Sequence, residues 1–370
     1  MLDIDKPLFG KEEKDILRRC INDASLFEGK YVLRFEKEFA DYCRIKYACA
    51  TMNGTSALHL ALVALKIKPD DEVLVPTLTF IASVSPVSFC GAKPVFVDCD
   101  PYTWCIDSED LKRKITNKSK AVIPVHLYGN ACDMDEICNI AKKYDLSIIE
   151  DCAEAQGTLY NGRQVGVFSS IAFFSFYKNK HITTGEGGMC LTNDKYLLTR
   201  LKLLRSHGKN KVEDLSVAEF AQKQFISSEL GFNYRMTDLQ AAIGLVQLKK
   251  INKAIAKRIK YAEIYAKALK DLDVILPSYN EHVVRHTFWG FPLLLKDAQT
   301  KTRIMLEFRK YGIRLRPFFN PCHLQPFYKH FKSRCPVAEE ISSRGIVLPN
   351  IHSLKEDDIY SVAKLLRKCL

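Results

Sequence analysis

No apolar run in this chain of 370 residues is long enough for a membrane helix, since such a span needs about 20 consecutive apolar residues. The first residues, Met1–Pro7, read MLDIDKP and lack the basic patch and apolar core of a secretory leader. Internal repeats and low-complexity tracts are also missing from the sequence. These absences predict a cytoplasmic protein that does not bind membranes.

Cysteine is plentiful, but its spacing lacks the usual signatures. The 13 cysteines are odd in number, scattered, and never arranged as Cys-x-x-Cys. This spacing argues against a zinc site, a redox motif or a disulfide framework. We therefore expect free thiols, some of them buried, and no metal centre.

The basic charge also lacks a pattern. The net charge is +12, from 55 Lys and Arg against 43 Asp and Glu, and both signs occur from end to end. A basic surface attracts polyanions, so a non-catalytic nucleic-acid-binding or regulatory protein remains the alternative of a different class. No nucleic-acid-binding motif stands out, which favours a solvated surface and no nucleic-acid partner.

Hydrophobic residues make up 47% of the chain, enough for a substantial core. Short apolar runs typical of strands occur at Val95–Asp98, Ala121–Val125, Ser147–Asp151 and Ile171–Phe176, and a helical pattern such as Asp133–Lys143 lies between them. This alternation predicts an α/β fold with βαβ crossovers and a mostly parallel sheet flanked by helices.

The C-terminal third predicts a smaller α+β domain. Apolar residues recur at helical spacing within Asp238–Leu272, which we expect to lead out of the large domain. We predict a large domain at residues 1–250 and a small one at 251–370. The polar stretch Gly208–Gln224 has few apolar anchors and predicts an excursion over the site. The small domain's predicted strands are His286–Leu295 and Ile313–Phe319, and its predicted helices are Thr302–Tyr311 and Lys355–Leu370.

The segment Ser175–Gly188, reading SFYKNKHITTGEGG, is the most informative part of the chain. Lys180 lies there between the strand-like run Ile171–Phe176 and a glycine-rich turn, and Asp151 and Ser175 also end apolar runs. In open α/β sheets, ligands bind outside the carboxyl ends of the strands. We expect the amine, the carboxylate and the hydroxyl to converge on one small molecule, and the combination suits pyridoxal phosphate.

Each group has a chemical reason to contact that cofactor. The amine of Lys180 would hold the aldehyde as a Schiff base and then move protons. Asp151 would face the pyridine nitrogen and favour its protonated form. Residues Asn53–Ser56 precede the helical stretch Ala57–Leu65, so their hydroxyls and backbone N–H groups suit a phosphate. Phe80 would stack on the ring.

Every one of these residues also has an ordinary structural interpretation. A lone lysine is usually solvated, Asp151 would cap the next helix, Thr55 and Ser56 are common N-caps, and Phe80 would be a core residue. Their order along the chain favours the cofactor site. That order resembles the DegT/DnrJ/EryC1/StrS sugar aminotransferase family of fold-type I pyridoxal phosphate enzymes. The matching segments are NGTSALHLAL at 53–62, PTLTFIAS at 76–83, HLYGNACDMDEI at 126–137, EDCAEAQG at 150–157, the lysine segment, and GFNYRMTDLQAAIGLVQL at 231–248.

The resemblance covers nearly the whole chain and implies a role for each matching residue. Lys180 would be the Schiff-base lysine, Asp151 the pyridine partner and Phe80 the stacking ring. The implied phosphate-binding residues are Gly54, Thr55, Ser56 and Ser175.

Two further residues carry implications. Glu154 stands where the family commonly has glutamine or histidine, close to the phenolic oxygen of the cofactor, so its protonation state and hydrogen bond are open. Asn233 matches an asparagine that reaches the phosphate of the neighbouring subunit. The resemblance therefore implies a homodimer with shared active sites.

The lysine separates two chemistries within the family. A dehydratase branch, which removes a sugar hydroxyl, has histidine where this chain has Lys180. Lysine implies amino transfer, with L-glutamate as donor and pyridoxamine phosphate as the intermediate form of the cofactor. The neighbouring His181 occurs in both branches and receives no catalytic role.

The acceptor is indicated by Arg314–His323, reading RLRPFFNPCH. With the lysine segment, this run is most similar to the perosamine synthase branch, which aminates carbon 4 of GDP-4-keto-6-deoxy-D-mannose. Arg316 and His323 are candidate substrate-binding residues, because guanidinium groups pair well with phosphate oxygens. Arg316 would equally bind the glutamate carboxylate or form a structural ion pair. The same chemistry on a UDP- or dTDP-linked 4-keto or 3-keto sugar remains the alternative.

Overall fold

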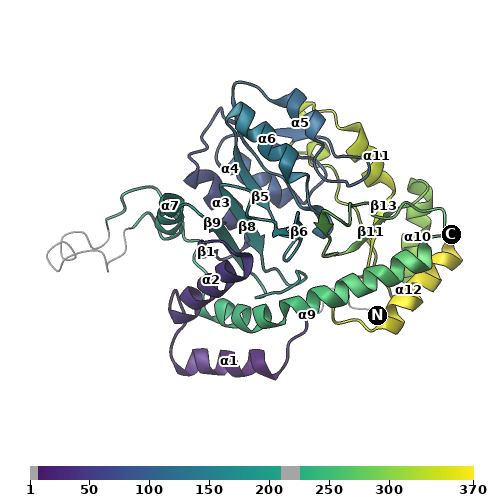
Figure 1. The fold of residues 1–370 in the computed structure, drawn as a ribbon, viewed down its shortest axis with the longest axis horizontal. Coiled ribbons are helices and arrows are strands. Elements are labelled where there is room, and N and C mark those ends of the chain that lie inside the picture. The colour runs from purple at the N-terminus through teal and green to yellow at the C-terminus, as the bar shows by residue number, and fades with distance from the viewer. Residues whose placement is uncertain (1–6, 210–225) are drawn as a thin grey trace.

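A computed structural model describes residues 7–209 and 226–370 of the chain. Most of the predicted excursion at 208–224 therefore lies outside the described residues. A seven-stranded sheet forms the centre of the molecule (Figure 1), with the strand order β1-β9-β8-β5-β4-β2-β3. In that order, the strands are Tyr47–Thr51, Gly188–Thr192, Ile171–Ser175, Ser147–Asp151, Ser119–Val122, Glu72–Pro76 and Lys93–Val97.

The prediction of a mostly parallel sheet flanked by helices is confirmed. Strand β2 pairs in parallel with β3 and β4, β4 with β5, and β5 with β8, whereas β9 runs antiparallel to both β8 and β1. All residues of β2, β8 and β9 are buried, as expected for strands covered on both faces. The parallel strands β5 and β8 therefore end at the same edge of the sheet.

Seven helices belong to this part of the described chain. They are α1 at Lys11–Asn22, α2 at Lys30–Cys43, α3 at Gly54–Ala64, α4 at Ser85–Phe89, α5 at Ser108–Lys114, α6 at Met134–Tyr144 and α7 at Lys195–Arg205. Short 3₁₀ turns lie at Ile81–Ser83 and Leu127–Gly129. Asn53 caps α3, because its side chain accepts a hydrogen bond from the Ser56 N–H.

Helix α9, Asp238–Leu269, runs along the molecule from α1 and α2 to α12 (Figure 1). It packs first against the core that surrounds the large sheet and then, from Tyr261 onward, against a second core. The predicted division at residue 250 falls inside this helix, and the domain boundary stays a prediction.

The second core is built on a three-stranded antiparallel sheet in the order β11-β13-β12. Its strands are Phe291–Leu294, Gly345–Leu348 and Arg316–Pro317, and its helices are α10 at Ala298–Lys310 and α12 at Glu356–Cys369. The buried apolar residues of α11, Pro336–Arg344, belong to the core around the large sheet. Turns of 3₁₀ type lie at Cys322–Leu324 and Lys329–Phe331. A third small sheet joins β10 (Val284–Arg285), β6 (Leu159–Tyr160) and β7 (Arg163–Gln164).

Two predicted strands of this region are shorter than expected. The run His286–Leu295 forms a strand only from Phe291, since Phe288 has a φ of 49° and takes the chain out of the extended conformation. The run Ile313–Phe319 contributes only Arg316 and Pro317 to the sheet. Among the described residues, no helix has the length and apolar character needed to cross a bilayer.

Candidate active site

A cavity of about 560 Å³ opens at the sheet edge where β5 and β8 end, a volume in the range of small-molecule sites. Eight of the sequence-predicted residues line it. They are Gly54, Thr55, Phe80, Asp151, Glu154, Ser175, Lys180 and Arg316. Residues predicted from five separate segments of the sequence thus meet in one pocket.

Lys180 lies in the turn that follows β8, where its N–H donates to the carbonyl of Tyr177. Its side chain is 11% exposed, and its Nζ lies 3.6 Å from Glu154 Oε1 and 4.7 Å from the ring centre of Trp289. Burial lowers the pKa of this lysine, while the nearby carboxylates of Glu154 and Asp151 oppose that change. The amine is therefore more easily deprotonated than an ordinary lysine.

Asp151 is the last residue of β5 and is 3% exposed. The Ser83 hydroxyl donates to one carboxylate oxygen at 2.7 Å, and the N–H of Ala153 donates to the other at 3.0 Å. Burial raises the pKa of Asp151, and these two hydrogen bonds and the charge of Lys180 oppose the rise. This carboxylate is fixed in orientation and lines the cavity.

Glu154 follows one turn later and is held from two sides. Its Oε2 accepts a hydrogen bond from the N–H of Tyr128 at 3.0 Å, and its Oε1 is the atom that faces Lys180. Burial raises the pKa of Glu154, and the charges of Lys180 and Arg316 oppose that rise. A negative charge at this position stabilises the ammonium form of the lysine.

The N-terminus of α3 meets Ser175 in the same cavity. A Cβ at Gly54 would come within 3.0 Å of Ser175 Cβ, so the two segments approach each other closely here and glycine is favoured. The N–H groups of Gly54 and Thr55 are in the first turn of α3 and have no acceptor within the helix. Together with the hydroxyls of Thr55 and Ser175, they form a site suited to a phosphate.

An aromatic wall closes another side. Phe80 is 56% exposed, and its ring centre lies 5.9 Å from that of Phe319. The ring of Tyr128 stacks nearly parallel to both Phe319 and Trp289. A flat ring system would find apolar faces here.

Three sequence-predicted residues do not line this pocket. Ser56 is buried, and its N–H is bound by the Asn53 side chain. His323 is 3% exposed, with Nδ1 near the Thr77 hydroxyl and Nε2 near Glu339. Asn233 is exposed on the surface of the single chain.

The structure also adds residues that sequence reasoning missed, chiefly Ser83 and Trp289. Ser83 lies at the end of the PTLTFIAS segment, which could have drawn attention to it. Trp289 is one of only two tryptophans in the chain, and this was the one feature of the sequence that could have marked it as a candidate site residue.

One group of potential metal ligands occurs among the described residues, formed by His126, Glu150 and Cys152. Hydrogen bonds already account for its arrangement. Glu150 accepts from the N–H groups of Gly166 and Phe168 and faces His126 Nε2. We assign no metal to this cluster.

The pocket matches the functional groups of pyridoxal phosphate. It offers an amine of lowered pKa, a buried carboxylate, a helix N-terminus beside two hydroxyls, and an aromatic wall. Gly54 and Thr55, in the first turn of α3, and Ser175 all line the cavity, which places the helix N-terminus and the hydroxyls at one side of it. The residues present therefore fit this cofactor.

Comparison with known proteins agrees with this geometry. A family model described as the DegT/DnrJ/EryC1/StrS aminotransferase family matches residues 7–367. The GDP-perosamine synthase of Escherichia coli O157:H7 is 40% identical over 360 residues, which cover 97% of this chain and 96% of that protein. The GDP-perosamine synthase of Caulobacter vibrioides is 41% identical, with 98% and 97% covered. A crystal structure of an aminotransferase from Psychrobacter cryohalolentis superposes with a TM-score of 0.92 at 32% identity, covering 98% of this chain and 97% of that one.

Proposed function

Because this chain belongs to the DegT/DnrJ/EryC1/StrS aminotransferase family, we propose that it moves the amino group of L-glutamate to carbon 4 of GDP-4-keto-6-deoxy-D-mannose. The product would be GDP-perosamine. The family is that of pyridoxal phosphate-dependent sugar aminotransferases, and this chain is one of them. The nearly full-length similarity to GDP-perosamine synthases is the observation that carries the choice of acceptor. Family membership also sets aside the interpretation as a non-catalytic nucleic-acid-binding protein.

In this proposal, each group of the pocket holds one part of the cofactor. Lys180 and Asp151 both line the pocket. Lys180 would provide the amine for the aldehyde, and Asp151 would bind the pyridine nitrogen. The N-terminus of α3, with Thr55 and Ser175, would hold the phosphate, and Ser56, which does not line the pocket, would support that turn. When bound, pyridoxal phosphate supplies the electron sink and carries the amino group between the two substrates.

Lys180 is also the group that moves the proton. A lysine must be neutral to accept a proton, and the burial of this side chain lowers its pKa toward that state. The indole of Trp289 and the carboxylate of Glu154 restrict where Nζ lies. An amine held in one place lies in the right position for proton transfer to and from the same substrate carbon, which lowers the entropic cost of general acid–base catalysis.

Glu154 sets how readily Lys180 loses its proton. Its Oε1 faces Nζ, and the N–H of Tyr128 keeps the other oxygen in place. Where glutamine would be neutral, this carboxylate adds a charge that favours the ammonium form. We propose that Glu154 lies near the phenolic oxygen of the cofactor and holds a proton there in part of the cycle.

Arg316 is the proposed contact for the anionic part of a substrate. It lines the pocket, and its guanidinium lies 5.2 Å from the ring centre of Trp289, on which Lys180 also packs. A planar guanidinium pairs with a phosphate or carboxylate through two hydrogen bonds. His323 lies in the buried layer behind Thr77, so we propose that it supports the pocket wall and contacts substrate only if that wall moves.

The functional form is proposed to be a homodimer. The family resemblance assigns Asn233 to the phosphate of a neighbouring subunit. In the single chain, Asn233 is exposed and does not line the cavity. Exposed apolar side chains occur at Leu26, Phe27 and Leu33 near α2, and at Met52 beside the start of α3. A second subunit would cover them and bring its Asn233 to this pocket.

Product analysis tests the proposal. The purified protein is incubated with pyridoxal phosphate, ¹⁵N-labelled L-glutamate and, separately, GDP-, UDP- and dTDP-linked 4-keto-6-deoxyhexoses and 3-keto sugars. The proposal predicts rapid label transfer to carbon 4 of the GDP sugar, located by NMR. Label at carbon 3, a clear preference for a UDP or dTDP sugar, or an unlabelled deoxy sugar would each contradict it.

A further inference from the structure

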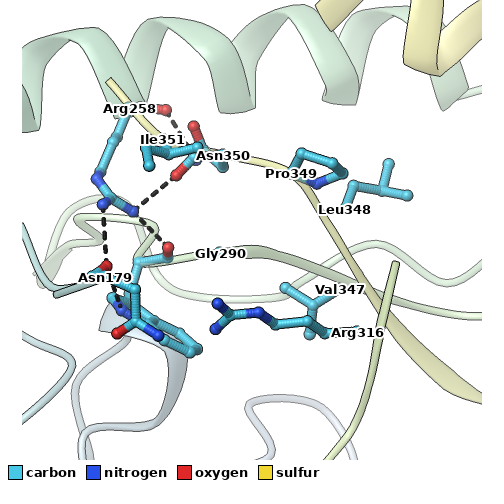
Figure 2. Close-up of a pocket in the computed structure, with 10 residues that line it drawn as sticks. Asn179, Arg258, Gly290, Arg316, Val347, Leu348, Pro349, Asn350 and Ile351 are labelled. Carbon is cyan, nitrogen blue, oxygen red and sulfur yellow. Dashed lines mark hydrogen bonds between the residues drawn. The ribbon is translucent and has the colours of Figure 1, made fainter. Parts of the chain in front are cut away.

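Arg258 is an almost fully buried cation that the assignments above leave without a role. It is 1% exposed and lies on α9 between the residues that pack on the large core and those that pack on the second core. Figure 2 shows its side chain pointing from α9 toward Asn179 and Gly290. Residues of this charge and depth are rare unless they hold something in place.

The guanidinium of Arg258 donates to four backbone carbonyls from three segments. One nitrogen donates to the carbonyls of Trp289 and of Asn350, the latter at 2.7 Å. The other nitrogen faces the carbonyls of Asn179 and Lys180, each at 3.4 Å. Arg258 therefore touches the peptide of the active-site lysine itself.

The same network fixes the indole beside the lysine amine. The Trp289 indole N–H donates to the carbonyl of Asn179 at 3.1 Å, and Nζ of Lys180 lies over the Trp289 ring. The carbonyl of Trp289 is bound by Arg258. The guanidinium of Arg258 thus binds the carbonyl of Lys180 and also that of Trp289, whose ring packs against the lysine side chain.

The buried charge of Arg258 destabilises the folded protein, because the side chain is not paired with a carboxylate in the cavity beside it. The small cavity beside Arg258, about 30 Å³, is lined by two arginines and two asparagines and by no carboxylate. Burial and the charge of Arg316 lower the pKa of Arg258 to about 9, so the charged form is held at a cost. Within residues 7–209 and 226–370, Arg258 Nε and Asn350 Oδ1 also lack a hydrogen-bond partner. If this position only filled the core, an apolar side chain such as methionine would give a more stable fold than a buried arginine.

We propose that Arg258 is a positioning residue for Lys180, fixing the lysine peptide and the Trp289 indole relative to α9 so that Nζ stays aligned for proton transfer. This inference rests on the proposed function of Lys180 and adds a residue to it. An arginine is needed because its planar group presents five N–H donors in fixed directions. A lysine would reach fewer of these carbonyls.

Lys257 provides a matched control on the same helix. Its Nζ donates to the carbonyls of His352 and Leu354, so it ties the same C-terminal loop to α9 that Arg258 ties through Asn350. Neither of these hydrogen bonds of Lys257 involves the lysine segment. Loss of Lys257 therefore tests loop anchoring alone.

The test is the single-turnover rate at which L-glutamate bleaches the bound cofactor, measured against glutamate concentration for wild type, Arg258→Met, Arg258→Lys and Lys257→Met. We expect Arg258→Met to slow the limiting rate by ~10-fold or more. The half-saturating glutamate concentration should change by less than ~3-fold, because Arg258 does not line the open pocket. Arg258→Lys should recover part of the rate, and Lys257→Met should retain nearly all of it. Borohydride trapping on Lys180, read by peptide mass, should fall in parallel for Arg258→Met.

Several results would overturn the inference. A wild-type limiting rate in Arg258→Met, or an equal loss in Lys257→Met, would show that Arg258 only anchors the loop. If Arg258→Met does not fold, Trp289→Phe replaces it, since this change keeps a ring but removes the donor to Asn179, and an unchanged rate would then contradict the proposal. A wild-type protein that glutamate does not bleach would instead refute the proposed function, which separates the two failures.

Discussion

Lys180 and Glu154 lie with Nζ and Oε1 3.6 Å apart in a buried site, and burial moves their proton affinities in opposite directions. The pKa of the lysine falls, because an ammonium loses its hydration, and the pKa of the carboxyl rises for the same reason. Their mutual attraction opposes both changes. Burial thus favours the neutral forms of both groups and their attraction favours the charged forms, so a change of charge at either group alters the proton affinity of the other.

Replacing the lysine tests its covalent role. Lys180→Ala should fold and still bind pyridoxal phosphate through the phosphate site, but borohydride should no longer attach the cofactor to the chain. Lys178→Ala is the matched control, since Lys178 is exposed in the same segment. Peptide mass spectrometry after reduction gives the answer, and cofactor found on another lysine in wild type would rule out the assignment.

Replacing the glutamate tests the electrostatic coupling. Glu154→Gln removes the negative charge that raises the pKa of Lys180, so this pKa should fall further. The rate of the half-reaction with glutamate rises as the lysine loses its proton. The rising limb of its pH profile should therefore move to lower pH in the variant.

Glu186→Gln is the control for that profile. Glu186 lines the same pocket, but the charges acting most strongly on Lys180 are those of Glu154, Asp151 and Arg316. A limb that stays in place in Glu154→Gln, or that moves as far in Glu186→Gln, would argue against the proposed coupling.

Sequence reasoning found the residues whose position follows from local pattern. Asp151 and Ser175 each end a buried strand, so their convergence follows from the parallel sheet. Trp289 and Arg258 could not be found in this way. Arg258 stands among exposed lysines in α9, and its burial depends on the second core packing against that helix.

At the scale of elements, the side chain of Asp238 connects the N-terminal ends of helices α2 and α9. Asp238, the first residue of α9, accepts hydrogen bonds from the N–H groups of Gly29 and Val32 at 3.2 and 2.9 Å, at the start of α2. The Ser25 hydroxyl also donates to it. Gly29 is required here, because a Cβ would collide with the carboxylate. The two helices are thereby fixed to each other beside the site.

This contact predicts a loss of stability. Asp238→Ala would leave the buried N–H of Val32 and the partly buried N–H of Gly29 without an acceptor, and should lower the free energy of unfolding by ~2–3 kcal/mol. Asp107→Ala removes an ordinary N-cap of the half-buried helix α5 and should cost ~1 kcal/mol. Urea denaturation of both variants compares the two values. Equal losses would show that the contact between α2 and α9 adds nothing to a simple cap.

The sequence predicted the elements with strong periodicity and missed the others. Strands β5 and β8 and helix α6 lie within one or two residues of the predicted runs. The strands β6, β7 and β10 have two residues each and carry no pattern of their own. These short strands form because tertiary packing brings their segments together. The antiparallel strand β9 also depends on its pairing with β8 and β1.

At the scale of the whole molecule, the proposed dimer makes the two subunits interdependent. If each site uses Lys180 of one chain and Asn233 of the other, Lys180→Ala and Asn233→Ala should each be nearly inactive alone. Co-expressed in equal amounts, they should recover about a quarter of the wild-type activity, since half the dimers are mixed and each has one intact site. Activity that stays at the level of the separate variants would contradict shared sites.

The family, the α/β class and many of the pocket residues could be predicted from motifs that span the chain, whereas Ser83 and Trp289 could not. The relation of the two cores could not, because it depends on how α9 packs over its full length, a non-local property of many weak contacts. The contacts of Arg258 arise at that junction and are therefore visible only in three dimensions.

The most direct test of the account is a spectral titration of the purified protein with pyridoxal phosphate, first with L-glutamate and then with GDP-4-keto-6-deoxy-D-mannose. We predict a yellow protein that glutamate bleaches and that regains its colour as the keto sugar accepts the amino group. A protein that never becomes yellow would contradict the cofactor site at Lys180 and Asp151. Bleaching that no GDP-linked keto sugar reverses would contradict the proposed acceptor.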